Sequence, residues 1–126
     1  MRLATITHPQ SPGLEISIVS LSGAAGGLSA NLNRWMKQID LPELKEPALE
    51  EFLSKQKTFK TQGGLTCLLV DFTTLQPQED LSLPGMLVGV VEIPEQTVFV
   101  KMTGPLSVLN QNRDAFEALC QSLKMR

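Results

Sequence analysis

The sequence has few of the side chains that most catalytic and metal sites use. It contains one histidine, His8, and two cysteines, Cys67 and Cys120, and the cysteines form no CxxC pair or other metal-ligand cluster. No serine or cysteine lies in a nucleophile motif, and nothing around His8 indicates a catalytic triad. The sequence therefore predicts no catalytic residues, no metal site and no cofactor, and we expect a protein that is not an enzyme.

Long apolar runs and basic clusters are also missing. No run approaches the ~18 apolar residues that a membrane-spanning helix needs, and the first residues lack an apolar segment of signal-peptide length. We therefore expect a soluble chain, as written, without a signal or a membrane span. The 11 basic and 13 acidic residues give a net charge of −2. No basic block or stripe offers a surface for a phosphate backbone, which argues against nucleic-acid binding.

The two cysteines lie in apolar patterns. Cys67 belongs to a strand-like run and Cys120 to the apolar face of a helical stretch, which predicts two buried free thiols. The alternative is a disulfide between them, which would require Cα atoms within about 7 Å of each other.

The pattern of apolar residues indicates one domain, residues 1–126, with its own hydrophobic core. Alternating or continuous apolar patterns predict strands at residues 2–8, 14–21, 57–61, 65–72, 86–93 and 97–103. Helical spacing predicts helices at residues 28–39, 47–56 and after 105, and residues 73–85 are expected to be a surface loop. This order predicts an α+β fold, an α/β/α sandwich with a central antiparallel sheet of about six strands.

One stretch, residues 23–39, combines a glycine-rich turn with an amphipathic helix. Its apolar residues recur at helical spacing, and we expect Trp35, on that stripe, to lie in the core. Glycines before a helix N-terminus can bind anions, but the spacing matches neither GxGxxG nor GxxxxGK[ST]. A turn from strand to helix is the favoured interpretation, and anion binding is the alternative.

The same stretch supplies the candidate binding residues, which are Gly26, Gly27, Asn31, Asn33, Arg34 and Gln38. In the functional interpretation they form a recognition patch for a carboxylate, a phosphate or a partner's backbone, with Arg34 as a bidentate donor. In the structural interpretation, Asn33 and Arg34 hydrogen-bond loop carbonyls and hold the helix against the edge of the sheet. We favour the structural interpretation.

Three motifs resemble a group of uncharacterised bacterial proteins. They are Gly-Gly-Leu-x-x-Asn-x-Asn-Arg-Trp-x-x-Gln (26–38), Val-Phe-Val-Lys-Met-Thr-Gly (98–104) and Phe-x-x-Leu-x-x-Ser-Leu (116–123). Members of the group carry Asn-Val-Asn-Arg-Trp-Arg-x-Gln and Phe-Phe-Lys-Leu-Thr-Gly at the first two positions, whereas this chain has Trp35-Met36 before Lys37. Many members have an upstream export or lipoprotein segment, so the resemblance implies a cell-envelope location where such a segment precedes the domain.

The order of elements is also similar to the PsbP-like α/β/α sandwich, which is shared by a photosystem extrinsic subunit and by nuclear-import Mog proteins that bind the GTPase Ran. This resemblance implies an architecture that docks onto protein partners rather than one that catalyses a reaction. We therefore expect a non-catalytic protein-binding or assembly module whose partner is an unknown protein. The alternative is a small-ligand or anion-binding protein that uses the turn and helix of residues 23–38.

Overall fold

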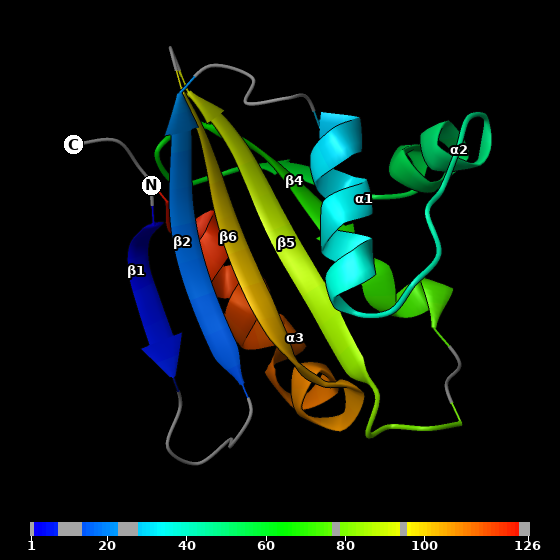
Figure 1. Cartoon of the computed structure of the whole chain (residues 1–126). Helices are drawn as coiled ribbons and strands as arrows, with labels where there is room; N and C mark the ends of the chain where they lie inside the picture. The colour runs from blue at the N-terminus through cyan, green and yellow to red at the C-terminus, as the bar shows by residue number, and fades with distance from the viewer. Residues whose placement is uncertain (1, 8–13, 23–27, 77–78, 94–95, 124–126) are drawn as a thin grey trace.

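The computed structural model describes residues 2–7, 14–22, 28–76, 79–93 and 96–123. Its strands form one antiparallel sheet in the order β1-β2-β6-β5-β4-β3 (Figure 1). The strands are β1 Arg2–Thr7, β2 Glu15–Ser22, β3 Lys57–Lys60, β4 Thr66–Asp71, β5 Pro84–Ile93 and β6 Gln96–Pro105. The helices are α1 Leu28–Gln38, α2 Ala48–Ser54 and α3 Leu106–Gln121, with a short 3₁₀ helix η1 at Phe72–Leu75. The prediction of an α+β fold around an antiparallel sheet is confirmed.

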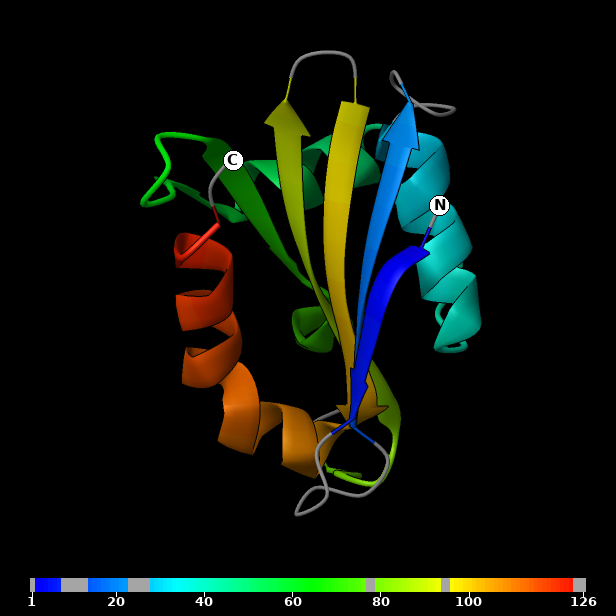
Figure 2. The same ribbon diagram turned by 90° about the vertical axis from the view of Figure 1, so that its left-hand side faces the viewer.

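Helices lie on both faces of this sheet. In Figure 2, α1 and α3 lie on opposite sides of the strands. Residues 85–91 of the central strand β5 are all buried, because successive side chains point to opposite faces and each face has a helix over it. Met86 and Val88 contribute to the core under α1 and α2, whereas Leu87 and Val91 contribute to the core under α3. We call these sides the α1 face and the α3 face.

Each face has its own hydrophobic core. On the α1 face the buried apolar residues are Leu32, Trp35, Met36, Ile39, Leu49, Phe52, Val70, Phe72, Met86, Val88, Val90 and Phe99. On the α3 face they are Leu14, Cys67, Leu87, Val91, Val100, Met102, Leu106, Leu109, Phe116 and Cys120. Trp35 is 5% exposed, and its ring meets that of Phe99 edge-on, with centroids 5.0 Å apart. The predictions that Trp35 is in the core and that both thiols are buried and free are confirmed.

α1 ends where the sequence predicts, through a backbone motif at Asp40. The amide of Leu41 donates to the carbonyl of Met36 at 2.9 Å, and Asp40 has a φ of 59°. A left-handed residue followed by this long hydrogen bond is the Schellman ending of a helix, and aspartate is one of the few residues that tolerates it. The chain therefore turns away from the axis of α1 after residue 39, and Leu41 and Leu44 of the next segment pack against the core of the α1 face.

Two boundaries differ from the prediction. Residues 73–85 are not simply a surface loop, because η1 forms at their start, with Phe72 and Thr73 buried. The Asp71 carboxylate caps η1 by accepting the amide of Thr73 at 2.9 Å. The sequence predicts that the last strand ends at residue 103, but β6 continues through Pro105. Gly104 pairs with Gly85 of β5, and Pro105 lies opposite Pro84. No helix in the described part of the chain is long and apolar enough to cross a membrane.

Candidate functional site

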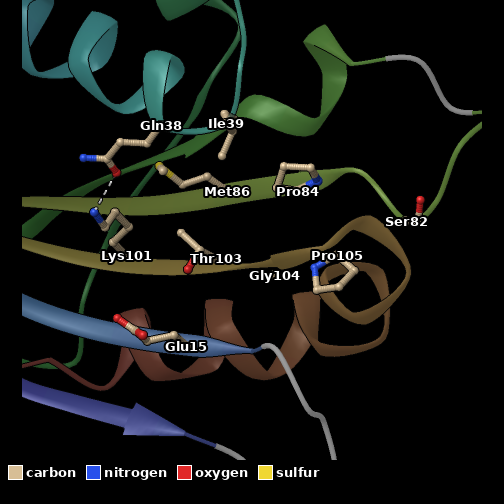
Figure 3. Close-up of a pocket in the computed structure, with 10 residues that line it drawn as sticks. All are labelled: Glu15, Gln38, Ile39, Ser82, Pro84, Met86, Lys101, Thr103, Gly104 and Pro105. Atoms are coloured by element: carbon tan, nitrogen blue, oxygen red, sulfur yellow. Dashed lines mark hydrogen bonds between the residues drawn. The ribbon is translucent and has the colours of Figure 1, made fainter.

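A groove lies on the α1 face, where α1 ends before the strands do. A helix of 11 residues is about 16 Å long, whereas a strand of 10 residues spans about 33 Å. Beyond the end of α1, where β2 and β5 begin and β6 ends, the surface is hollowed to a volume of about 460 Å³ (Figure 3). The groove is lined by Glu15, Gln38, Ile39, Ser82, Pro84, Met86, Lys101, Thr103, Gly104 and Pro105.

The register of the sheet arranges the floor of the groove in a row. Glu15 of β2 lies opposite Thr103 of β6, and Thr103 lies opposite Met86 of β5. The row runs from an exposed carboxylate through a half-buried hydroxyl to a fully buried thioether, beside which Ile39 lies at the end of α1. The groove is therefore polar toward β2 and apolar toward α1.

Lys101 supplies the positive charge of the groove and connects it to α1. It stands two residues before Thr103 on the same face of β6, and its ammonium donates to Gln38 Oε1 at 3.1 Å (Figure 3). Glu15 lines the same groove from the neighbouring strand. The groove thus has a cation and an anion in its lining beside the apolar side chains of Ile39 and Met86, and such a surface can bind a molecule that carries both signs of charge.

The lining of the groove includes a carboxylate, Glu15, a hydroxyl, Ser82, and an ammonium, Lys101. The ten lining residues that the structure describes include no histidine and no cysteine. Among the residues that the structure describes, no group of three or more histidines, cysteines, aspartates or glutamates could hold a metal ion. The described lining can recognise a ligand through hydrogen bonds, charge and apolar contact.

Of the predicted site residues that the structure describes, Gln38 alone lines the groove. Asn33 instead binds the segment after α1, since its Oδ1 accepts the Leu44 amide at 2.9 Å and its Nδ2 donates to the Leu44 carbonyl at 3.2 Å. These two bonds copy the pairing of a peptide group and hold residues 41–47 beside α1. This is the contact with a loop backbone that the structural interpretation assigned to Asn33.

Arg34 and Asn31 form a pair one turn apart on α1. Arg34 is exposed, and its guanidinium donates to the side-chain oxygen of Asn31, which is 2% exposed. The structural interpretation expected Arg34 to bond to a loop carbonyl, but the contacts described show its bond to Asn31 instead. Arg34 is not among the residues that line the groove. Gly26, Gly27 and His8 fall outside the described residues.

Asn33→Ala is expected to lower the free energy of unfolding by about 1 kcal/mol, because it removes both bonds to Leu44 at a half-buried position. Lys37→Ala, at an exposed position on the same helix, is the matched control, and we expect it to change this free energy by less than about 0.5 kcal/mol. Urea unfolding followed by circular dichroism measures both. A larger loss for Lys37→Ala than for Asn33→Ala would contradict the structural role of Asn33.

Sequence reasoning missed most of the groove. Lys101 and Thr103 lie in the motif Val-Phe-Val-Lys-Met-Thr-Gly (98–104), whereas Glu15 comes from a strand near the other end of the chain. The motif by itself does not indicate a groove, because the other lining residues belong to other elements. A second signal was present, since the predicted helix at residues 28–39 is too short to cover strands of eight or more residues. Comparing these two lengths would have indicated an uncovered patch of sheet, although not its location.

A second polar cluster connects α3 to β4 and η1 on the other face. The guanidinium of Arg113 pairs with the Asp71 carboxylate and donates to Thr73 Oγ1 at 3.0 Å. The sequence placed Arg113 on the solvent side of its helix, and its side chain is 37% exposed. Because the cluster satisfies its own charges, we interpret it as a structural link between the elements.

Comparison with known proteins finds a solved structure with a similar fold, but it does not assign the chain to a family. No family model matches the sequence, and no curated protein is significantly similar to it. Among solved structures, the chain is similar to the crystal structure of the protein of unknown function PA94 from Pseudomonas aeruginosa. The TM-score is 0.53 at 16% sequence identity, and the match covers 91% of this chain and 76% of that one. At this identity the likeness concerns the fold alone.

Proposed function

We propose that this protein is a non-catalytic protein-binding module that takes a polar segment of a partner protein into the groove at the end of α1. The observation that supports this proposal most is that Glu15 and Lys101 line one groove together with the apolar side chains of Ile39 and Met86. A peptide segment carries carboxylate, basic and apolar groups on one chain, and it matches this combination.

The shape of the groove favours a segment of a larger molecule over a small ligand. Sites for small molecules bury 70–90% or more of the ligand surface. This groove instead lies open on the face of the sheet, with exposed side chains such as Glu15, Gln38 and Ser82 around it (Figure 3). A segment whose neighbouring residues continue over the surface of the domain can use such an opening.

We also propose that the domain is an α/β/α sandwich of the PsbP-like type. This assignment rests on the order of elements together with helices on both faces of an antiparallel sheet. The proteins that share this architecture by resemblance use it to dock onto partners, which agrees with a binding role. A non-catalytic role agrees with a groove that has no histidine or cysteine among the lining residues that the structure describes.

Thr103→Arg tests the groove directly, because a half-buried hydroxyl at its centre is replaced by a long cationic side chain. The full chain is immobilised and exposed to a lysate of the organism that encodes it, and retained proteins are quantified by mass spectrometry. We expect a specific partner whose retention falls at least tenfold with Thr103→Arg, which corresponds to about 1.4 kcal/mol or more. Thr58→Arg is the matched control, at an exposed position on the edge strand β3.

Retention that is equal for Thr103→Arg and Thr58→Arg would show that the partner binds elsewhere, and it would refute the groove. The alternative function, binding of a small ligand or anion, is examined by thermal shift with phosphate and with free amino acids. A rise in melting temperature that scales with RT ln(1 + [L]/Kd), and that Thr103→Arg abolishes, would favour that alternative.

A further inference from the structure

Two free thiols lie together between α3 and the sheet, far from the groove. Cys67 of β4 and Cys120 of α3 are each 0% exposed. Both lie against Gly89 of β5, where the position of an added Cβ would be 2.7 Å from Cys120 Sγ and 3.5 Å from Cys67 Sγ. Because Gly89 has no side chain, the two sulfurs occupy the space that a side chain would fill.

The two thiols are hydrogen-bonded to each other, and this bond makes them chemically unequal. The bond from the Cys120 thiol lowers the pKa of Cys67, although burial opposes this. The same bond raises the pKa of Cys120, and burial and the charge of Glu117 raise it further. Of the two, Cys67 is therefore the thiol that forms the nucleophilic thiolate more readily.

The pair lies next to an element that can open without unfolding the sheet. Cys120 is in the last turn of α3, and the end of α3 is held by the β3–β4 turn. The amide of Gln62 donates to the carbonyl of Gln121 at 2.7 Å, and that of Gly63 donates to the carbonyl of Leu123 at 3.2 Å. Terminal helical turns open at a lower free energy than central strands, so a small oxidant gains access when this turn opens.

We propose that Cys67 and Cys120 form a site of reversible oxidation, at which a hydroperoxide converts the thiol pair into a disulfide between β4 and α3. The Cys67 thiol releases its proton, the thiolate attacks one peroxide oxygen, and the O–O bond breaks. With hydrogen peroxide the leaving hydroxide takes up that proton, so the products are a sulfenic acid on Cys67 and water. The Cys120 sulfur then attacks the Cys67 sulfur, the S–O bond breaks, and the hydroxyl leaves as a second water with the proton of Cys120. The two thiols lose two electrons, and the peroxide gains them.

The experiment uses the full chain in its reduced and folded form, exposed to hydrogen peroxide in native buffer. Free thiols are then alkylated with iodoacetamide in denaturant, and intact mass and peptide mapping report the outcome. We expect a monomer with no alkylated cysteine and a peptide that links Cys67 to Cys120. The link closes a long loop, so the melting temperature is expected to rise by about 10 °C and to return after dithiothreitol.

Cys120→Ala is the matched variant, because it leaves Cys67 without a partner. We expect peroxide to form no internal link and to give no rise in melting temperature. A sulfenic acid on Cys67, which dimedone traps, should form more slowly than the link forms in the parent, because the hydrogen bond that lowers the pKa of Cys67 is gone. If this variant does not fold, the peroxide experiment on the parent protein tests the proposal by itself. Two alkylatable thiols in the folded parent after peroxide, a link that forms only in urea, or a link that lowers the melting temperature would each overturn it.

Discussion

Trp35→Ala is expected to lower the free energy of unfolding by about 3–5 kcal/mol, the cost that is typical of deleting a large buried aromatic side chain. The indole is 5% exposed, and it packs edge-on against Phe99 of β6. Its removal leaves a cavity between α1 and the sheet and also removes the aromatic contact, which contributes about 0.5–1.5 kcal/mol beyond burial. Trp35 is the single tryptophan of the chain, so unfolding in urea must be followed by circular dichroism rather than by fluorescence.

Lys37→Ala is the matched control for this prediction. Lys37 is exposed on the same helix, and we expect its replacement to change the free energy of unfolding by less than about 0.5 kcal/mol. A loss below about 1 kcal/mol for Trp35→Ala would mean that α1 contributes little to the core of the α1 face. The position of Gln38 and Ile39 over the groove would then need another explanation.

Gly89→Ala is expected to lower the free energy of unfolding by about 2 kcal/mol, because the new methyl group would stand 2.7 Å from Cys120 Sγ. The loss would not come from the backbone, since Gly89 is not among the residues with positive φ and alanine tolerates extended strand geometry. The same urea titration by circular dichroism measures it. Glu92→Ala, at an exposed position on the same strand, is the control and should change the free energy by less than about 0.5 kcal/mol.

Cys120→Ala provides a second and sharper check on the cause of this loss. With the Cys120 sulfur removed, the remaining neighbours of the new methyl group would be 3.5 Å and 3.7 Å away, which are ordinary contact distances. Gly89→Ala should therefore cost at least about 1 kcal/mol less in the Cys120→Ala background than in the parent. Equal costs in the two backgrounds would show that the clash with Cys120 is not the reason.

Periodicity in the sequence was sufficient for the elements and for much of the core. The alternating pattern after residue 96 predicts which side chains of β6 share a face, and Val100 and Met102 do lie together under α3. Helical spacing likewise predicted that Trp35 and Met36 are buried, and both are. These predictions are confirmed because the spacing of apolar residues along the chain follows the repeat of the helix or strand, which places them on one buried face.

What the sequence did not reveal depends on contacts between distant elements. η1 is capped locally by Asp71, but it also depends on the packing of Phe72 on Phe52 of α2, with ring centroids 5.7 Å apart, and this second contact has no local pattern. Asn33 was predicted to bond to a loop, but the identity of its partner, Leu44, depends on the path of the chain after α1. The groove combines β2 with β5 and β6, so its residues are adjacent only in the folded sheet.

The order of strands has a consequence for how this groove comes into existence as the chain folds. β3, β4, β5 and β6 follow one another in the chain and pair as neighbours, so they assemble through short loop closures. β2 pairs with β6, from the other end of the sequence, and this is the slow kind of contact to form. Glu15 lies on β2, whereas Lys101 and Thr103 lie on β6, on the other side of that junction. A chain that has folded its four-strand meander but not yet added its N-terminal hairpin would have a core and no complete groove, so binding reports completion of the sheet.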